Sequence, residues 1–184
     1  GVTPVTTICY RAHMQIAVLC AAKKSIYKTI ENLEVYDEKR NARSYTGTFP
    51  VIAHPPCRGY SAFTRHWAKP RPGEKDLALF CTERMLLNGG VLEHPAHSRY
   101  VRNFKMDKRF RIATIHQSWW GYPTTKKTWL LMPSHYKLPE IPFSLKMQGK
   151  EKQIFENMSH FDRHRTTLEF ATWLIKLIEV NHET

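Results

Sequence analysis

A short uninterrupted apolar segment near the start of the chain restricts its fold more than any other feature. Residues 15–20 (QIAVLC) contain no charged side chain, a pattern typical of a strand that other elements cover on both faces. Residues 33–37 and 49–53 also have strand-like composition, and residues 25–30 between them favour a short helix. This alternation predicts an α/β fold, a minimal Rossmann-like and mostly parallel sheet covered by helices.

Later segments predict the edge of this sheet and two longer helices. Residues 110–117 alternate apolar and polar side chains and residues 128–132 are apolar, so we expect an antiparallel hairpin at one edge of the sheet. Residues 74–88 have helical spacing and end at a Gly-Gly pair. Thr166 and Glu169 form a capping box before the last helix. Its expected apolar stripe consists of Leu168, Ala171, Leu174, Ile175 and Ile178.

The length of the chain and its local patterns predict one domain. A chain of 184 residues is long enough to bury a core. Residues 1–13 lack clean periodicity and Met14 opens the first strand, so we expect residues 1–13 to be an upstream extension or a cloning remnant. Residues 14–184 are then a single α/β catalytic domain. Within it, the basic, proline-containing residues 65–75 predict a mobile loop over the site.

Charge and cysteine content restrict the partners and the location. The chain has 28 Lys and Arg against 16 Asp and Glu, a formal charge of +12, which favours DNA or a nucleotide as partner. Cys9, Cys20, Cys57 and Cys81 have neither zinc-site nor disulfide-framework spacing, so we expect no metal and a reducing, cytoplasmic location. No apolar segment has the length of a membrane span, so we expect no membrane partner. The oligomeric state stays open.

Three predicted strand ends carry side chains suited to chemistry. The first is His54-Pro-Pro-Cys57, where two prolines restrict the backbone and hold the thiol in place. Glu93 and His94 end the next strand, and residues 119–127 form a basic aromatic loop. Because loops at the carboxyl ends of parallel strands converge, these three segments are expected to share one site.

This grouping suits covalent chemistry on a pyrimidine ring. A thiolate from Cys57 can add to ring carbon 6, while the carboxyl group of Glu93 polarises the far edge of the ring. His54 and His94 can tune the thiol, so we predict all four as catalytic residues. The expected substrate or nucleic-acid contacts are Pro56, Arg58, Arg65, Ser98, Trp119, Trp120, Lys126 and Lys127. Each also fits a structural role, the tryptophans in a core and the lysines in a solvated turn.

Three motifs, in this order, resemble those of the DNA cytosine-5 methyltransferases. Residues 55–57 (PPC) are similar to the Pro-Cys nucleophile loop, residues 93–95 (EHP) to the Glu-Asn-Val loop, and residues 121–127 (GYPTTKK) to the Gln-x-Arg-x-Arg segment. The resemblance covers about residues 50–132. The whole chain, including residues 36–43, looks most like small bacteriophage-type proteins with these motifs, which implies a bacterial host cytoplasm.

The resemblance also implies roles for individual residues. Cys57 would be the covalent nucleophile, Glu93 would bind or protonate the base edge, and Lys126 would be a basic contact at the first Arg position. The family uses S-adenosylmethionine, which it binds with a Phe-x-Gly-x-Gly loop. Residues 20–24 (CAAKK) stand in that place here.

The cofactor therefore has two open alternatives. An acid at the end of the second strand commonly binds a ribose or cofactor hydroxyl, so we expect Asp37, with Arg40, Ser25 and Tyr27, to form a cofactor-binding set. Methyl transfer from S-adenosylmethionine could use this different loop. Alternatively, no cofactor is needed, and an amine or amino acid is transferred to an activated 5-substituted uracil.

Three classes of function follow from these observations. The first is a transferase that modifies a pyrimidine in DNA or in a nucleotide through a Cys57 adduct. The second is a non-catalytic nucleic-acid-binding protein on a decayed methyltransferase scaffold, which the missing glycines favour. The third is a hydrolase or phosphoryl-handling protein that uses His54, His94 and His97.

Overall fold

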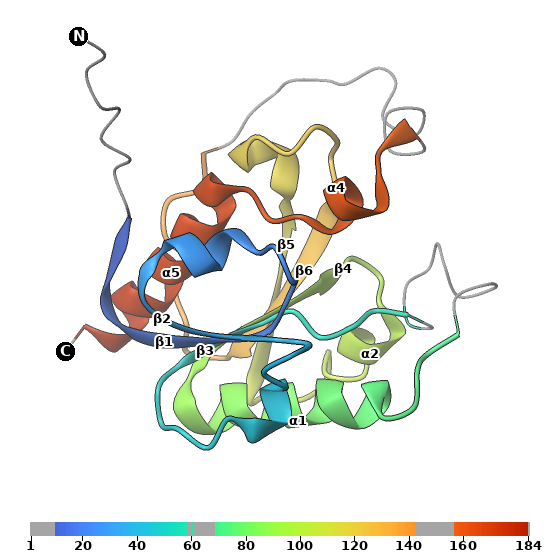
Figure 1. The fold of residues 1–184 in the computed structure, drawn as a ribbon. Coiled ribbons are helices and arrows are strands. Elements are labelled where there is room, and N and C mark those ends of the chain that lie inside the picture. Colours follow the sequence, from blue (N-terminus) through green and yellow to red (C-terminus); the bar gives the residue numbers. More distant parts are fainter. Residues whose placement is uncertain (1–9, 59, 61–68, 143–156, 184) are drawn as a thin grey trace, which may run out of the picture.

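The protein has the predicted α/β architecture, built on one six-stranded mixed sheet (Figure 1). The computed structural model describes residues 10–58, 60, 69–142 and 157–183. The strands are β1 (Arg11–Ala21), β2 (Glu31–Asp37), β3 (Val51–Ala53), β4 (Gly90–Pro95), β5 (Phe110–His116) and β6 (Lys127–Pro133). The helices are η1 (Ile26–Thr29), η2 (Ala42–Ser44), α1 (Glu74–Asn88), α2 (Arg99–Arg102), η3 (Gln117–Trp120), α4 (His160–His164) and α5 (Leu168–His182).

The strand order explains how distant loops reach one place. In the order β2-β1-β3-β4-β6-β5, the first four strands are parallel, and β6 is antiparallel to both β4 and β5. The predicted antiparallel pair at the edge is therefore confirmed. Because Pro95 pairs with Thr128 and His116 pairs with Lys127, the turn between β5 and β6 lies at the carboxyl ends of the parallel strands.

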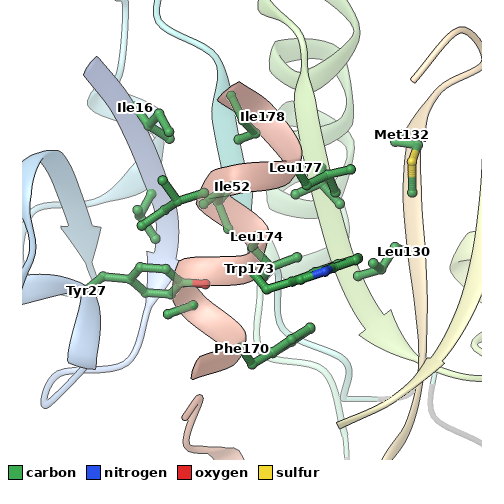
Figure 2. Packing of buried hydrophobic residues seen from close by; sticks show 14 of the residues in the cluster. Ile16, Tyr27, Ile52, Leu130, Met132, Phe170, Trp173, Leu174, Leu177 and Ile178 are labelled. Atoms are coloured by element: carbon green, nitrogen blue, oxygen red, sulfur yellow. The ribbon is translucent and has the colours of Figure 1, made fainter. Parts of the chain in front are cut away.

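Two apolar layers cover the two faces of the sheet. On β1, Ile16 and Val18 belong to the layer that contains α5, whereas Ala17 and Leu19 belong to the layer that contains α1. All four are fully buried, as the apolar run at residues 15–20 predicts. Figure 2 shows the α5 layer, in which aliphatic and aromatic side chains of α5 meet residues from β1, β3 and β6. Burying each such side chain contributes about 1.5–3 kcal/mol.

The first strand begins earlier than the sequence predicts. β1 starts at Arg11 and not at Met14, because two contacts fix the preceding residues. The Glu31 amide donates to the carbonyl oxygen of Tyr10 at 3.0 Å, and the His13 amide donates to Oε1 of Glu179 on α5 at 2.7 Å. Residues 11–13, which were expected to precede the domain, are therefore part of β1. Among the described residues, no helix combines the length and apolar composition needed to cross a membrane.

The last helix is capped one residue later than its capping box predicts. Thr167, not Thr166, is the N-cap of α5, and its Oγ1 accepts a hydrogen bond from the Phe170 amide at 3.2 Å. The same hydroxyl donates to the carbonyl oxygen of Trp120 at 2.8 Å. Thr167 thus joins the start of α5 to η3.

We expect Thr167→Ala to lower the free energy of unfolding by about 1–2 kcal/mol, because it removes both the cap and the link to Trp120. Thr166→Ala is the matched control and should change it by less than about 0.5 kcal/mol. Urea unfolding of both variants measures the difference. Equal losses for the two threonines would contradict the assignment of the cap.

Candidate active site

The Pro-Pro-Cys turn lies at the carboxyl end of β3, as predicted. The His54 amide donates to the carbonyl oxygen of Leu19 at 3.0 Å, which fixes the turn to the neighbouring strand β1. The Tyr60 amide donates to the carbonyl oxygen of Cys57 at 3.0 Å and closes the turn on its other side. The Cys57 thiol is half-buried between these two anchors.

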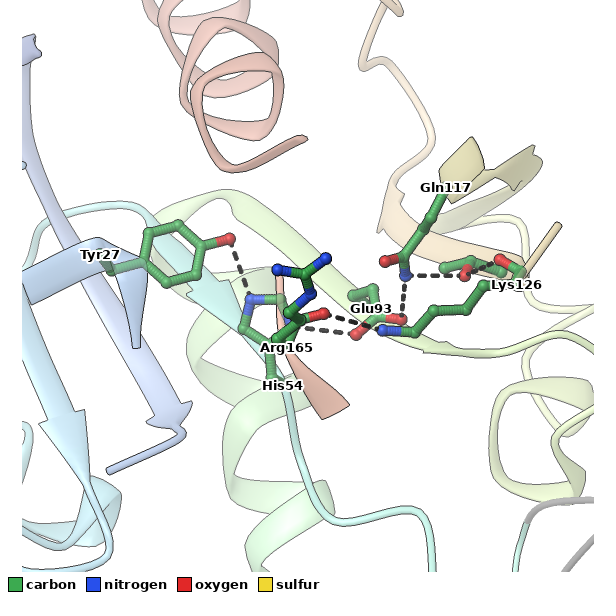
Figure 3. A network of polar contacts seen from close by, with 7 residues as sticks. Tyr27, His54, Glu93, Gln117, Lys126 and Arg165 are labelled. Carbon is green, nitrogen blue, oxygen red and sulfur yellow. Dashed lines mark hydrogen bonds and ion pairs between the residues drawn. The ribbon is translucent and has the colours of Figure 1, made fainter. Parts of the chain in front are cut away.

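A chain of hydrogen bonds links three segments of this site (Figure 3). His54 Nδ1 lies 2.9 Å from Oε2 of Glu93 on β4, and Oε1 of Glu93 accepts from Nε2 of Gln117 at 3.2 Å. The side chains of His54 and Glu93 are only 13% and 15% exposed. Both carboxylate oxygens are thus held in place by groups from other elements.

The chain continues on both sides of this pair. His54 Nε2 lies 3.0 Å from the hydroxyl of Tyr27, which is buried, and Gln117 Nε2 also donates to Oγ1 of Thr128 at 2.9 Å. Tyr27, expected to bind a cofactor, is therefore a partner of His54. Sequence reasoning missed Gln117 and Thr128, although Gln117 ends a predicted strand and the strand-end argument applies to it equally.

Glu93 is ionised at neutral pH despite its position. Burial alone would raise the pKa of this carboxyl group, but the hydrogen bond and the positive charge of His54 lower it more, with a smaller contribution from Lys126. The net result is a pKa below the ordinary value of 4.5. Because a carboxylate only accepts hydrogen bonds, His54 must carry a hydrogen on Nδ1.

Cys57, Glu93 and Lys126 act on one another electrostatically. Burial and the negative charge of Glu93 raise the pKa of the Cys57 thiol, while the positive charges of Lys126 and Arg58 lower it. Burial lowers the pKa of Lys126, and the charges of Glu93 and Cys57 oppose this change. The three residues predicted from three separate loops therefore share one site.

We expect Lys126→Met to raise the pKa of Cys57 further, because the variant removes a neighbouring positive charge. Alkylation of Cys57 by iodoacetamide at pH 8 should slow by about two- to tenfold, since the thiolate is the reactive form. Peptide mass mapping between pH 6 and 10 measures the rate at this cysteine alone. Lys127→Met, which changes an exposed neighbour, should leave the dependence of the alkylation rate on pH unchanged. Equal pH profiles for the two variants would contradict the interaction between Lys126 and Cys57.

His94 and Ser98 lie in the buried layer next to the site. His94 is 1% exposed and Ser98 is 0% exposed, and His94 Nδ1 lies 2.6 Å from Oγ of Ser98. The His94 ring packs between Tyr60 and Tyr100, and burial lowers its pKa. The expectation that Ser98 contacts the substrate is therefore wrong, and His94 is a buried, neutral positioning residue.

The two tryptophans of η3 have different surroundings. Trp120 is 4% exposed, and its ring centroid lies 4.7 Å from Trp173 and 5.1 Å from Phe170. It is a core residue, so the expectation that it stacks on a base is wrong. Trp119 is partly exposed beside His116, at a centroid distance of 4.9 Å, and retains an accessible aromatic surface.

The remaining predicted contacts lie beside Cys57 or outside the described residues. Pro56 is half-buried, and Arg58 donates to the carboxylate of Glu74 through Nε at 2.9 Å and Nη2 at 2.6 Å. Lys127 is exposed at the start of β6. Arg65 lies outside the described residues, as do residues 65–68 of the loop expected over the site. Residues 69–75 are described, and the last two of them begin α1.

The expected cofactor-binding residues serve local structure. Asp37 accepts from Nζ of Lys28 at 2.6 Å and from the Arg40 amide at 3.0 Å, and these bonds lower its pKa to about 2. The Arg40 guanidinium lies 4.0 Å above the ring centroid of Tyr36, and Ser25 caps η1. Asp37 therefore has a cationic and an amide partner within the chain.

Residues 20–24 also differ from a cofactor loop. Cys20 has a φ of 61°, and its Sγ lies 3.6 Å from Sγ of Cys81 on α1. These contacts tie the end of β1 to α1. Among the described residues, no group of three His, Cys, Asp or Glu side chains could hold a metal ion.

Comparisons of the chain with protein-family models, with curated proteins and with solved structures found no match.

Proposed function

We propose that this protein is a base-modifying transferase that attacks carbon 6 of a pyrimidine with Cys57. The observation that carries the proposal is that Cys57 follows β3, Glu93 lies near the end of β4 and Lys126 precedes β6, so that all three lie at the carboxyl ends of the parallel strands. A half-buried thiol beside a fixed carboxylate and an ammonium group suits nucleophilic addition to an electron-poor ring.

The adduct step uses groups of this chain alone. The Cys57 thiol loses its proton to solvent water, a bond forms between sulfur and carbon 6, and the ring electron pair moves toward carbon 5 and the carbonyl oxygen on carbon 4. Lys126, by its charge, favours the thiolate. The adduct is resolved when carbon 5 has exchanged its substituent and the bond between sulfur and carbon 6 breaks again, which returns the thiolate.

The ionised state of Glu93 favours a uracil-type ring. A carboxylate only accepts hydrogen bonds, and ring nitrogen 3 of uracil or thymine carries a hydrogen to donate. In cytosine the same nitrogen is an acceptor and would need a protonated Glu93, whereas the pKa of Glu93 is lowered. His54, hydrogen-bonded to Glu93 at 2.9 Å, would hold this carboxylate in position.

The cofactor-free variant agrees best with these contacts. In a uracil that carries a leaving group on its 5-methylene, the electron pair released at carbon 5 expels that group as an anion. An amine then adds to the exocyclic methylene and loses a proton, and sulfur leaves carbon 6. This route needs no cofactor bound at Asp37.

A covalent trap tests the proposal. Single-stranded DNA that contains 5-fluoro-2′-deoxyuridine should form a complex with the protein that survives denaturation, at a mass equal to the sum of the two. Mass analysis of nucleosides after expression in a bacterial host would then identify the transferred group. If the protein binds this DNA in a salt-dependent way but never forms the complex, the alternative of a non-catalytic nucleic-acid-binding protein, which the charge of +12 favours, replaces the proposal.

The hydrolase alternative has little support from the histidines. His54 uses both ring nitrogens in contacts with Glu93 and Tyr27, His94 is buried, and the His97 ring packs on Trp129 at a centroid distance of 5.1 Å. The three side chains therefore have separate roles.

A further inference from the structure

Basic side chains of α4 and of the turn before β6 gather next to the candidate active site. The helix is fixed through its backbone, because the buried hydroxyl of Tyr122 lies 3.0 Å from the carbonyl oxygen of Asp162 and 3.1 Å from that of Arg163. Figure 3 shows Lys126 donating to the carbonyl oxygen of Arg165, at 3.1 Å. The segment that contains α4 is thereby held against the turn between β5 and β6.

Lys126 is half-buried, and among the described residues its ammonium group forms no ion pair with a carboxylate, although the charge of Glu93 acts on it. Its ammonium group lies 4.4 Å from the ring centroid of Tyr122 and donates to a neutral carbonyl. Its backbone φ is 38°, in a region that non-glycine residues rarely adopt. A half-buried charge of this kind is stabilised when an anion binds beside it, and backbone strain persists mostly at functional sites.

Two histidines add to this positive cluster. The rings of His160 and His164 lie 4.5 Å apart between centroids, and both side chains are exposed. Burial and the positive charges of His160, Lys126, Arg58 and Arg163 lower the pKa of His164. His164 therefore faces cations from α4, from the turn before β6 and from the turn after β3, an environment that favours an anionic ligand.

The acidic side chains near this cluster already have partners within the chain. Asp162 accepts from the Ser159 hydroxyl at 2.6 Å and lies 3.9 Å from Nε of Arg165. Glu74 is bonded to Arg58, and Glu93 to His54. None of the three lies within ion-pair distance of Lys126 among the described residues, so an external anion is the partner this cluster lacks.

We propose that Lys126, His160 and His164 bind a phosphate group of the substrate, next to Cys57. This deepens the proposed function, on which it rests, because it names a phosphorylated nucleoside as the substrate. Two sources share this chemistry: a free nucleotide and the backbone of a nucleic-acid strand. Phosphate binding should favour the protonated form of His164, so affinity should increase as the pH falls from 7.5 to 6.

The test uses the Cys57→Ala protein, so that no covalent chemistry is involved. Binding of thymidine 5′-monophosphate and of a fluorescent single-stranded dT12 is measured, with thymidine as the phosphate-free comparison. Lys126→Met and His164→Ala, each added to this background, should weaken phosphate-dependent binding about tenfold or more. Lys137→Met and His135→Ala, exposed residues at the opposite end of the sheet, are the matched controls and should have no effect.

The outcomes separate the sources and the two proposals. Loss of monophosphate binding identifies a free nucleotide, whereas loss with dT12 alone identifies the nucleic-acid backbone. The phosphate site is overturned if neither probe binds, if Lys126→Met and His164→Ala bind both like the parent, or if acid strengthens dT12 binding equally without His164. If the phosphate site is overturned but the covalent complex with 5-fluoropyrimidine DNA still forms, the proposed attack by Cys57 is retained. If phosphate binds as expected but no covalent complex forms, the phosphate site is retained and the proposed attack is refuted.

Discussion

Cys57→Ser should remove the covalent complex with 5-fluoropyrimidine DNA and lower the rate of base modification by about 10³-fold or more. A serine hydroxyl at this position is not ionised near neutral pH and is a poor nucleophile toward a ring carbon, whereas a thiol reacts through its thiolate. The pKa of Cys57 is already raised by burial and by Glu93. The rate of the unmodified protein should therefore still increase with pH above 9, the ordinary thiol value.

Cys20→Ser is the matched control for this experiment. Cys20 is also half-buried, but its thiol faces Cys81 and not the site, so complex formation should be unchanged. Denaturing electrophoresis and intact-protein mass measurement detect the complex, and peptide mapping locates the bond. A complex that persists in Cys57→Ser, or one mapped to another residue, would refute the assignment of the nucleophile.

The arrangement of the site follows from patterns that act over short distances in the sequence. The apolar residues of β1 could be assigned to a strand because a strand covered on both faces has apolar side chains on both faces. Once the sheet is parallel, the ends of β3 and β4 must lie together, which brings Cys57 close to Glu93 without any knowledge of tertiary contacts. The prolines of the turn act locally too, so the position of the thiol could be predicted.

The errors concern choices that distant residues decide. Trp119 and Trp120 are adjacent and alike, and only packing against Trp173 on α5 determines which one enters the core. Thr166 and Thr167 both suit an N-cap, and the hydrogen bond to Trp120 favours the second.

The sequence also does not show which polar or charged side chains pair with one another. Asp37 fits a cofactor hydroxyl by its position, but Lys28 lies across the short connection from β1 to β2 and reaches it at 2.6 Å. Gln117 becomes part of the site only because the pairing of β5 with β6 places Thr128 beside it. Such pairings depend on register, which a sequence pattern does not specify to one residue.

Glu93→Gln should lower the rate of base modification by about 10²- to 10⁴-fold, the range typical of a lost acid–base group. The amide keeps the shape of the side chain but loses the charge that accepts from His54 and from Gln117. One of these donors would then face the NH₂ group of the new glutamine. The N3–H of a uracil-type ring would also lose its ionised acceptor.

The pH dependence distinguishes this role from a structural one. Because the folded pKa of Glu93 is lowered, its ionised form adds stability above the unfolded value of about 4.5, and this contribution is lost as the pH falls through the folded pKa. Activity should have the same acid limb, below pH 4.5, and Glu93→Gln should flatten both. Glu83→Gln, an exposed change on α1, should preserve rate and profile. If Glu93→Gln keeps the acid limb of activity, Glu93 does not contact the reacting base.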